Sequence, residues 1–527
     1  MRTFWLVLVA VAALSGGLAA EGQGGTKQAA IPLPPMGWSS WNSFSNTINS
    51  DIVIAQAKAM VSTGMAKTGY RQINIDEGWW LGERDPQGNI VVDPKAWPAI
   101  APGEKPGDMG NIVRFIHAQG LKAGIYTDAG ADGCSLYPDL GPVYHHVGSE
   151  GHYEQDFLQF AKWGFDYVKV DWCGGDKENL DPAVQYAEIG RAIQRAEAIT
   201  GHRLYLSLCE WGKNSPWTWA PGVGGMKADV WRTSGDIVDP IVASGMNSGR
   251  KAGFQKMLAN FDQGIHPEAE HTGFYNDPDM MVLGMPGLTD AENRVHMALW
   301  AMSGAPLLVG ADLTRLSAAT LATLTNPGVL AIDRDGLGLQ AVRVASYGDG
   351  LEVWSKPLAK PGERAVLLLN RTAGPAQIAA RWSDLGLADA PATVEELWTG
   401  KELGSFKTSY TGTVEAGDAV LLLVNGSEGR FTSYKAEPGT RETVRFSHVA
   451  GSARVARVEI LYANAGKAAR LVELRVNGRI ATRIALPPTA AIAGKVTIQS
   501  LLDRTGAENV LEFSGAGGVG IQSIAVQ

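Results

Sequence analysis

Short apolar runs alternate with longer amphipathic segments from Pro35 to about Gly336. The runs have the length of β-strands, and the longer segments place apolar residues at helical spacing. We expect eight strands, around Gly37 and at 72–76, 122–128, 167–171, 204–210, 228–234, 273–279 and 306–310. We expect helices at 51–63, 109–119, 154–163, 183–198 and 289–302. Eight strand–helix repeats predict an α/β fold, a (β/α)8 TIM barrel over residues 31–336.

The helical period ends after about Leu337, where short β-rich segments bounded by glycine, proline or aspartate begin. Segments at 339–344, 351–354, 365–370 and 419–424 predict an antiparallel β-sandwich over residues 337–425. Further alternating segments lie at 443–446, 456–462, 471–476, 495–500 and 509–513. They predict a second, C-terminal β-sandwich over residues 430–527.

The first residues have the order of a secretory signal. Arg2 precedes an apolar run over 4–14, and small residues follow over 16–20. We interpret residues 1–20 as a signal peptide and residues 21–30 as a linker; a buried N-terminal helix is the alternative interpretation. The run is too short to span a bilayer, and no later run reaches 18 apolar residues. We therefore expect a secreted or periplasmic protein without a membrane span.

Composition excludes several classes of partner and chemistry. A net charge of -8 offers no broad cationic surface for nucleic acid, and 45% hydrophobic residues exclude whole-chain disorder. The sixteen tryptophans suit sugar binding, although most tryptophans in proteins are core residues. Zincin, CxxC and phosphate-loop motifs do not occur. The three cysteines permit one disulfide and leave one thiol over.

Acidic residues recur where the predicted strands end, which is the active-site face of a TIM barrel. They are Asp76, Glu77, Asp128, Asp171, Glu210, Asp236, Asp277 and Asp279. Lys169 and Asp171 share one face of a strand, so we expect Lys169 to hold Asp171 ionised as a nucleophile. With Asp236 as a second carboxyl across a sugar, this would be a retaining glycosidase pair. Strand-end caps or loop ion pairs are the alternative interpretation of both acids.

Seven motifs between Pro35 and Val424 together resemble a known enzyme family. In chain order they read PPMGWSSWNSF, INIDEGWW, GLKAGIYTDAG, DYVKVDWC, SLCEWG, WRTSGDI and NDPDMMVLG. This order resembles glycoside hydrolase family 27, the α-galactosidases and α-N-acetylgalactosaminidases. The resemblance implies a retaining exo-glycosidase with a (β/α)8 barrel followed by a β-sandwich, and no metal or organic cofactor for catalysis.

The resemblance also implies a role for each matching residue. Asp171 matches the nucleophile and Asp236 the acid/base. The residues that match the sugar subsite are Trp41, Asp76, Glu77, Tyr126, Lys169, Glu210 and Arg232. Cys134 and Cys173 match a family disulfide, which leaves Cys209 as a buried free thiol.

Glu77 is the departure that bears on the sugar. Most α-galactosidases of the family have Asp-Asp here, whereas this chain has Asp76-Glu77. The extra methylene is expected to enter the space of the C6 hydroxymethyl group, which β-L-arabinopyranose lacks. The alternative is that the backbone absorbs the extra carbon and galactosidase activity persists. We expect the partner to be an oligosaccharide or polysaccharide with terminal α-galactose or β-L-arabinopyranose.

The C-terminal region resembles carbohydrate-binding modules of family 35 or 6, which often hold a structural calcium. Glu437 is the candidate calcium ligand. Residues 489–494, where such modules place aromatic sugar contacts, contain none, so a purely structural module is as compatible as a sugar-binding one. For the whole chain the alternatives are a catalytically inactive lectin-like protein and an isomalto-dextran-cleaving relative.

Overall fold

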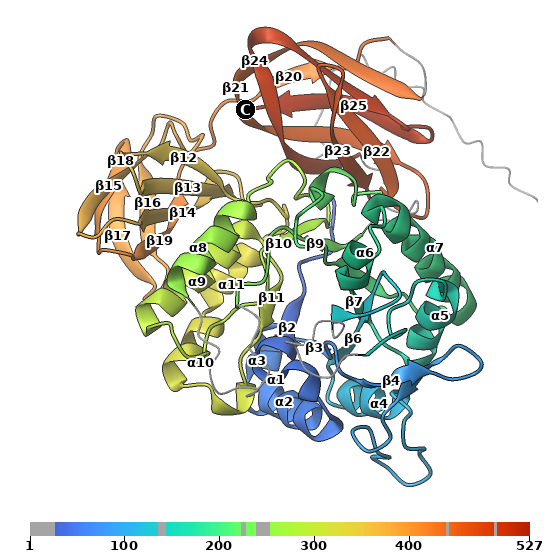
Figure 1. Ribbon diagram of the computed structural model, residues 1–527. Helices are drawn as coiled ribbons and strands as arrows, with labels where there is room; N and C mark the ends of the chain where they lie inside the picture. Colours follow the sequence, from blue (N-terminus) through green and yellow to red (C-terminus); the bar gives the residue numbers. More distant parts are fainter. Residues whose placement is uncertain (1–26, 135–143, 223–227, 239–252, 439–441, 490–492) are drawn as a thin grey trace, which may run out of the picture.

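The computed structural model describes residues 27–134, 144–222, 228–238, 253–438, 442–489 and 493–527 (Figure 1). The expected signal peptide and the first part of the expected linker lie outside the described residues. Residues 27 and 28, which we expected within the linker, instead form the strand β1 (Lys27–Gln28), which pairs in parallel with the C-terminal module. Among the described residues, no helix is both long and apolar enough to cross a membrane.

An eight-stranded parallel sheet forms the first unit and confirms the predicted TIM barrel. Its strands are β2 (Met36–Ser39), β3 (Gln72–Asn74), β6 (Lys122–Asp128), β7 (Tyr167–Asp171), β8 (Tyr205–Leu208), β9 (Val230–Arg232), β10 (Tyr275–Asp277) and β11 (Leu307–Val309). Their order in the sheet is β10-β9-β8-β7-β6-β3-β2-β11. A parallel bridge between Met281 and Val309 joins the segment after β10 to β11 and closes the barrel.

Helices follow the strands and cover the outside of the barrel (Figure 1). They are α1 (Trp41–Phe44), α2 (Ser50–Ser62), α3 (Met65–Thr68), α4 (Gly110–Ala118), α5 (Tyr153–Trp163), α6 (Cys173–Lys177), α7 (Pro182–Thr200), α8 (Phe254–Gln263), α9 (Asp290–Ser303), α10 (Ala318–Leu324) and α11 (Pro327–Asp333). Local sequence sets the helix ends. Asp181 caps α7 ahead of Pro182, and Thr289 and Glu292 form a capping box at α9. A hairpin of β4 (Trp80–Arg84) and β5 (Ile90–Val92) extends from the loop after β3.

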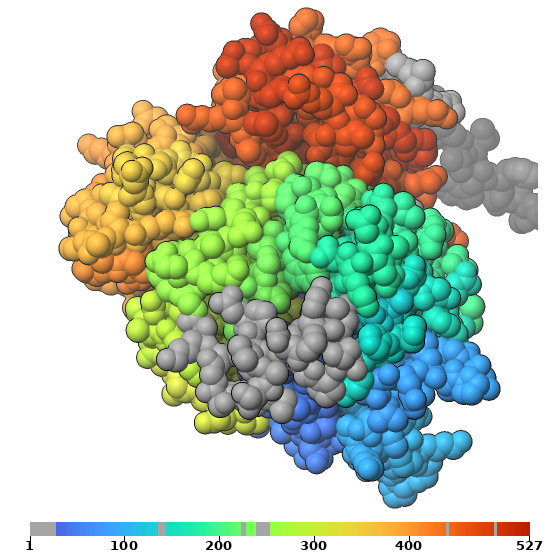
Figure 2. Space-filling view, viewed as in Figure 1, coloured from blue at the N-terminus to red at the C-terminus, as the bar shows by residue number. Residues whose placement is uncertain are grey.

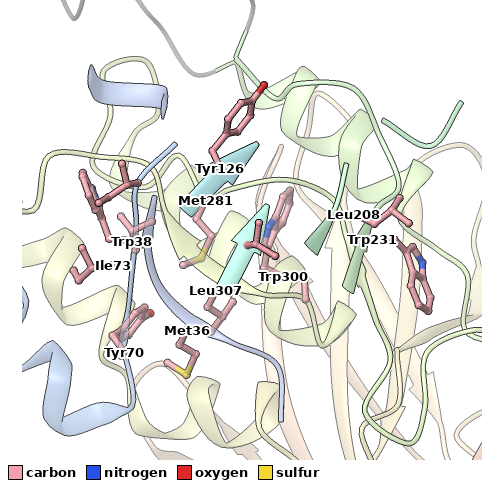
Figure 3. Close-up of a cluster of buried hydrophobic side chains, with 14 of the residues drawn as sticks. Met36, Trp38, Tyr70, Ile73, Tyr126, Leu208, Trp231, Met281, Trp300 and Leu307 are labelled. Carbon is pink, nitrogen blue, oxygen red and sulfur yellow. The ribbon is translucent and has the colours of Figure 1, made fainter. Parts of the chain in front are cut away.

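The barrel core is continuous and rich in large side chains. Trp38, Trp231 and Trp300 are fully buried. They belong to one cluster with apolar residues of every barrel strand except β10 (Figure 3). In Figure 3 the hydroxyl of Tyr126 points away from the other labelled side chains. Burial of this much apolar surface is the main term that holds the barrel together.

The second unit confirms the predicted antiparallel β-sandwich. Its strands are β12 (Val342–Ser346), β13 (Leu351–Pro357), β14 (Glu363–Asn370), β15 (Ala376–Arg381), β16 (Ala392–Glu396), β17 (Lys401–Phe406), β18 (Ser409–Val414) and β19 (Ala419–Asn425). A six-stranded sheet, β12-β13-β14-β19-β16-β17, is joined by the pair β15-β18 around its own apolar core. Strand β14 is apolar along most of its length because it is the third of six strands in this sheet.

The C-terminal unit differs in detail from the expectation. Its strands are β20 (Thr432–Lys435), β21 (Thr443–Asn464), β22 (Arg470–Val476), β23 (Arg479–Leu486), β24 (Gly494–Ser514) and β25 (Val519–Val526). The segments expected as separate strands at 443–446 and 456–462 are both parts of β21, and those at 495–500 and 509–513 are both parts of β24. β21 and β24 pair with each other along most of their length within one seven-stranded sheet. The apolar residues of this sheet pack into a single core.

The three units pack against one another (Figure 2). Trp354 and Leu421 of the sandwich and Ala485 of the C-terminal unit belong to the apolar core cluster of the barrel, and polar contacts add to this packing. His271 of the barrel lies 2.9 Å from Thr482 of the C-terminal unit, measured between Nε2 and Oγ1. Glu428 is bound by Arg364 of the sandwich and by Arg457 of the C-terminal unit. These contacts connect the three units.

Candidate active site

Strand ends bring the predicted acidic residues to one face of the barrel. Asp171 ends β7 and Asp277 ends β10, while Asp76, Glu210 and Asp236 follow β3, β8 and β9. A cavity opens among these strands. Its lining residues include Asn74, Asp76, Lys169, Cys209, Arg232, Asp277, Asp279 and Met280.

Asp171 is a buried carboxylate with two local partners. The Trp172 amide donates to its Oδ1 at 3.0 Å, and Lys169 Nζ lies 3.4 Å from its Oδ2. Burial raises the pKa of Asp171 above its ordinary value; Lys169 opposes this shift, whereas the charges of Asp236 and Asp76 add to it. Lys169 thus favours the ionised form of Asp171, as expected, but the sequence did not predict that burial has the larger effect.

Lys169 is shared between two carboxylates. Its Nζ lies 3.1 Å from Asp76 Oδ2, closer than to Asp171, and 5.1 Å from the centre of the Tyr126 ring. Burial alone would lower the pKa of Lys169, but the charges of Asp76 and Asp171 outweigh it and raise this pKa well above its ordinary value. Lys169 therefore stays cationic between the two acids.

Asp236 sits in a different environment. Its side chain is 44% exposed, and its Oδ1 accepts from Arg232 Nη2 at 3.2 Å. The same Arg232 nitrogen lies 3.1 Å from Oδ2 of buried Asp279, and Asp279 also accepts from the Ile237 amide at 2.8 Å. Arg232 thus holds the carboxyl of Asp236, and Asp279 holds the amide of the next residue, Ile237.

The remaining expected subsite residues surround these two groups. Tyr126 is buried, and its hydroxyl has no hydrogen-bond partner within the described part of the chain. Glu210 is fully buried; its Oε2 accepts from Asn214, and burial raises the pKa of Glu210 to about 7. Trp41 is half-buried and packs against the cluster of Tyr167, Met280 and Leu308.

Glu77 lies beside Asp76 and is only 1% exposed. A methyl group added at Gly133 would come within 2.6 Å of Glu77 Oε1 and 3.4 Å of the Trp80 ring. The carboxylate of Glu77 is therefore confined between the β3 end and the loop after β6, and glycine at position 133 leaves the space that it occupies.

The structure confirms the expected disulfide between Cys134 and Cys173, which have a Cα–Cα separation of 5.0 Å, and it leaves Cys209 as a buried free thiol among the described residues. The two bonded sulfurs lie within 4.8 Å of carboxylate oxygens of Asp128 and Asp171. Because both sulfurs are consumed in the disulfide, this group does not offer the thiolates that a zinc ion prefers.

Glu437, the candidate calcium ligand, is engaged by its own module. Its Oε1 accepts from the Ser447 amide at 3.0 Å, and its Oε2 lies 3.8 Å from Arg445 Nε. Within the part of the chain that the structure describes, Glu437 belongs to no group of three potential metal ligands. A calcium ion prefers six to eight oxygen ligands, so this surrounding does not fit one.

Sequence reasoning missed the partners of Asp279 and Asp128 within this site. Both were recognised as strand-end acids, but their neighbours in space were not. Asp279 is 47 residues from Arg232, so only the pairing of β9 with β10 brings them together. The pairing of β6 with β7 likewise places Asp128 opposite Asp171.

Comparison with known proteins decides the family. The family model described as "Alpha galactosidase A" matches residues 33–335, which is more than half of the chain. The chain belongs to the α-galactosidase family. A probable α-galactosidase from Dictyostelium discoideum is 38% identical over 72% of this chain and 88% of that protein. Membership of this family makes the chain a glycoside hydrolase of the α-galactosidase type.

Solved α-galactosidase structures share the fold of the barrel and sandwich. The α-galactosidase I of Mortierella vinacea is 28% identical and covers 76% of this chain and 98% of its own, with a TM-score of 0.65. A family 27 β-L-arabinopyranosidase from Geobacillus stearothermophilus has a TM-score of 0.63 at 22% identity, covering 75% of this chain and 97% of its own. At that identity the likeness shows the fold alone.

The two C-terminal units also match α-galactosidase models. Residues 348–424 match the "Alpha galactosidase C-terminal beta sandwich domain", and residues 443–526 match "Alpha-galactosidase, CBM13 domain". The second match replaces the family 35 or 6 module that the short motifs suggested. Motifs such as LRVNG report an alternating strand and a turn, which unrelated β-modules share, so they do not separate module families.

Proposed function

We propose that this α-galactosidase family member is a retaining exo-glycosidase that removes terminal β-L-arabinopyranosyl and α-D-galactosyl residues. The observation that supports this most is the contrast between two acids at one barrel mouth. Asp171 is buried beside a cation, whereas Asp236 is half-exposed on Arg232. Two carboxyls in different surroundings suit two different catalytic roles.

In the first step, the Asp171 carboxylate attacks the anomeric carbon while the bond to the leaving oxygen breaks. The Asp236 carboxyl gives its proton to that oxygen. In the second step, a water molecule attacks the glycosyl-aspartate, Asp236 takes the proton of that water, and Asp171 is released as a carboxylate. The charge of Asp236 is among those that raise the pKa of Asp171, which supports this pairing of the two acids.

The sugar would be held by groups that surround Asp171. Asp76 and Lys169 would bind hydroxyls through charge-assisted hydrogen bonds, and Trp41 would cover a ring face. The Tyr126 hydroxyl and the Oε1 of Glu210 are buried polar atoms without a hydrogen-bond partner among the described residues, and a sugar hydroxyl would satisfy them. An inactive lectin-like protein would not need the two acids, and nothing in the described residues favours an isomalto-dextran substrate.

Glu77 supports a preference for the sugar without a C6 group. Its carboxylate is confined beside Asp76, so the extra methylene has little room to withdraw from the subsite. One methylene of mismatch in a subsite is worth about 1 to 3 kcal/mol. We therefore infer that β-L-arabinopyranosides are hydrolysed in preference to α-D-galactosides.

Two further predictions of the sequence remain predictions. We propose that the enzyme is exported to an extracellular or periplasmic compartment, supported by the pattern of residues 1–20 and by the disulfide at Cys134. A calcium ion in the C-terminal module also stays a prediction, and the contacts of Glu437 speak against that residue as its ligand.

Hydrolysis of two aryl glycosides tests the proposed function. Wild type should release nitrophenol from the β-L-arabinopyranoside and the α-D-galactopyranoside, and Asp171→Ala should lower turnover by about a thousandfold or more. Azide should restore turnover of Asp171→Ala and yield a glycosyl azide, because it replaces the missing nucleophile. Asp176→Ala, which removes a half-exposed acid of α6, the helix that follows β7, is the matched control and should keep activity. Wild-type inactivity on both glycosides would refute the proposal.

A further inference from the structure

Asp128 is a fully buried carboxylate without a role in the steps above. It ends β6 and pairs in register with Asp171 at the end of β7. Residues paired in this way point to the same face of a parallel sheet, so both side chains lie on one side. A carboxylate oxygen of Asp128 lies within 4.8 Å of one of Asp171.

Both oxygens of Asp128 accept backbone hydrogen bonds from the loops that follow β6 and β7. Gly130 and Gly174 amides donate to Oδ1 at 2.7 Å and 3.1 Å, and the Cys173 amide donates to Oδ2 at 2.7 Å. The preceding amide, that of Trp172, donates to Asp171 Oδ1. Three consecutive amides of one turn therefore hold two neighbouring carboxylates.

We propose that Asp128 is a positioning residue for the nucleophile. By holding the amides of Cys173 and Gly174, it fixes the turn over 172–174 and thereby the direction in which Asp171 presents its carboxylate. This inference rests on the proposed function, in which Asp171 attacks the sugar. A misplacement of about 1 Å at a reacting group can cost about a hundredfold in rate, so a small loosening of this turn matters.

The protonation of Asp128 is linked to that of the nucleophile. Burial and then the charge of Asp171 raise the pKa of Asp128 well above its ordinary value. The charged groups that act on Asp171 are Lys169, Asp236 and Asp76. Asp128 therefore gives up its proton after Asp171, so a neutral amide in its place should leave the pH at which Asp171 ionises unchanged.

Asp128→Asn is the variant that tests the proposal. Asparagine has nearly the same shape as aspartate. Its NH2 group, however, replaces one of two oxygens that both accept from backbone N–H groups, so at least one hydrogen bond is lost. We expect kcat on an aryl glycoside to fall about a hundredfold while KM changes less than about threefold. The acid limb of kcat/KM should stay where it is in wild type, because Asp128 holds its proton to higher pH than Asp171 does. Denatured variant should still show one thiol, that of Cys209, which reports an intact disulfide.

Asp132→Asn is the matched control. Asp132 is a buried acid of the same loop, and it ties that loop to α6 through Lys177 at 2.7 Å and to the His146 amide at 2.8 Å. It takes no part in the group that includes Asp171. This control should keep kcat within about threefold of wild type and leave the pH profile in place, so a general loosening of the loops is separated from positioning.

Three results would overturn the proposal. They are an Asp128→Asn enzyme with kcat within threefold of wild type, an equal loss of kcat in Asp132→Asn, or a loss in KM alone. If Asp128→Asn does not fold, Asp128→Glu carries the test: it keeps the carboxyl group but shifts its position, so kcat should fall, and full activity would refute positioning. Wild-type inactivity would instead refute the proposed function.

Discussion

At the scale of single residues, the site contains more buried acids than cations. Lys169 serves Asp76 and Asp171, and Arg232 serves Asp236 and Asp279. Because Arg232 is divided between two carboxylates, its ion pair with Asp279 does not fully compensate the burial of that acid. This explains why the pKa of Asp279 is raised to about 6 by burial despite the adjacent Arg232. A bound sugar with several hydroxyl donors would complete the hydrogen bonding of these acids.

Glu77 carries the prediction about sugar choice. Glu77→Asp shortens the side chain that lies against Gly133 and should open the space for a C6 hydroxymethyl group. The ratio of kcat/KM for the aryl α-D-galactopyranoside to that for the β-L-arabinopyranoside should rise by about tenfold or more. The same swap at exposed Glu83 of the β4–β5 hairpin is the control and should leave the ratio unchanged. An unchanged ratio in a folded Glu77→Asp enzyme would exclude Glu77 as the gate.

Residue-level prediction from sequence succeeded where the chain itself brings groups together. Alternation along one strand was enough to place Lys169 beside Asp171. The net effect on Asp171 was missed because burial, which outweighs the lysine, depends on the whole surrounding structure. The link from Arg232 to Asp279 was missed because it depends on the register of two strands, which single-sequence patterns do not specify.

At the scale of elements, the barrel strands were predicted well and the C-terminal strands less well. A buried parallel strand is a short apolar run with clear ends, so its limits are visible in sequence. In β21, the register shifts near residues 446–454, and His448 and Ala453 adopt left-handed backbone angles. Such bulges look like turns in a sequence pattern, so one long strand was divided into two.

Glu428 binds an arginine of the sandwich and an arginine of the C-terminal unit, and its removal is expected to lower the stability of the protein. Arg364 is 2% exposed and Arg457 is mostly buried, and both donate to this one carboxylate. Burial alone would raise the pKa of Glu428, but the hydrogen bond from Arg364 and further contacts lower it to about 2, so the carboxylate is ionised at neutral pH.

Glu428→Gln should therefore destabilise the protein at pH 7 by about 2 kcal/mol, because two buried guanidinium groups lose their counter-charge. Thermal unfolding followed by circular dichroism measures the shift of the midpoint. Glu437→Gln, at an exposed acid of the neighbouring module, is the control and should change the midpoint little. Equal midpoints for wild type and Glu428→Gln would show that the pair contributes nothing to stability.

At the scale of the whole molecule, the barrel and the C-terminal unit share a buried histidine contact. His271 Nε2 lies against the Thr482 hydroxyl, and the Ala485 amide of the same strand donates to Thr272. Burial lowers the pKa of His271 from 6.5 to about 4. Both states are neutral above pH 6.5, whereas between 6.5 and 4 only the unfolded chain takes up the proton. The contribution of His271 to stability is thus complete above pH 6.5 and decreases as the pH falls toward 4.

His271→Gln should consequently unfold at a lower temperature than wild type at pH 7, since it loses one contact across the interface. The difference between the two midpoints should shrink as the pH is lowered to 4.5, because wild type alone loses the contribution of a neutral His271 over that interval. His296, whose pKa burial lowers to about 3, is present in both proteins and cancels in the comparison. His152→Gln, at a partly exposed histidine, should keep a constant difference from wild type. A midpoint difference for His271→Gln that stays constant from pH 7 to 4.5 would mean that the titration of His271 does not contribute to the pH dependence of stability.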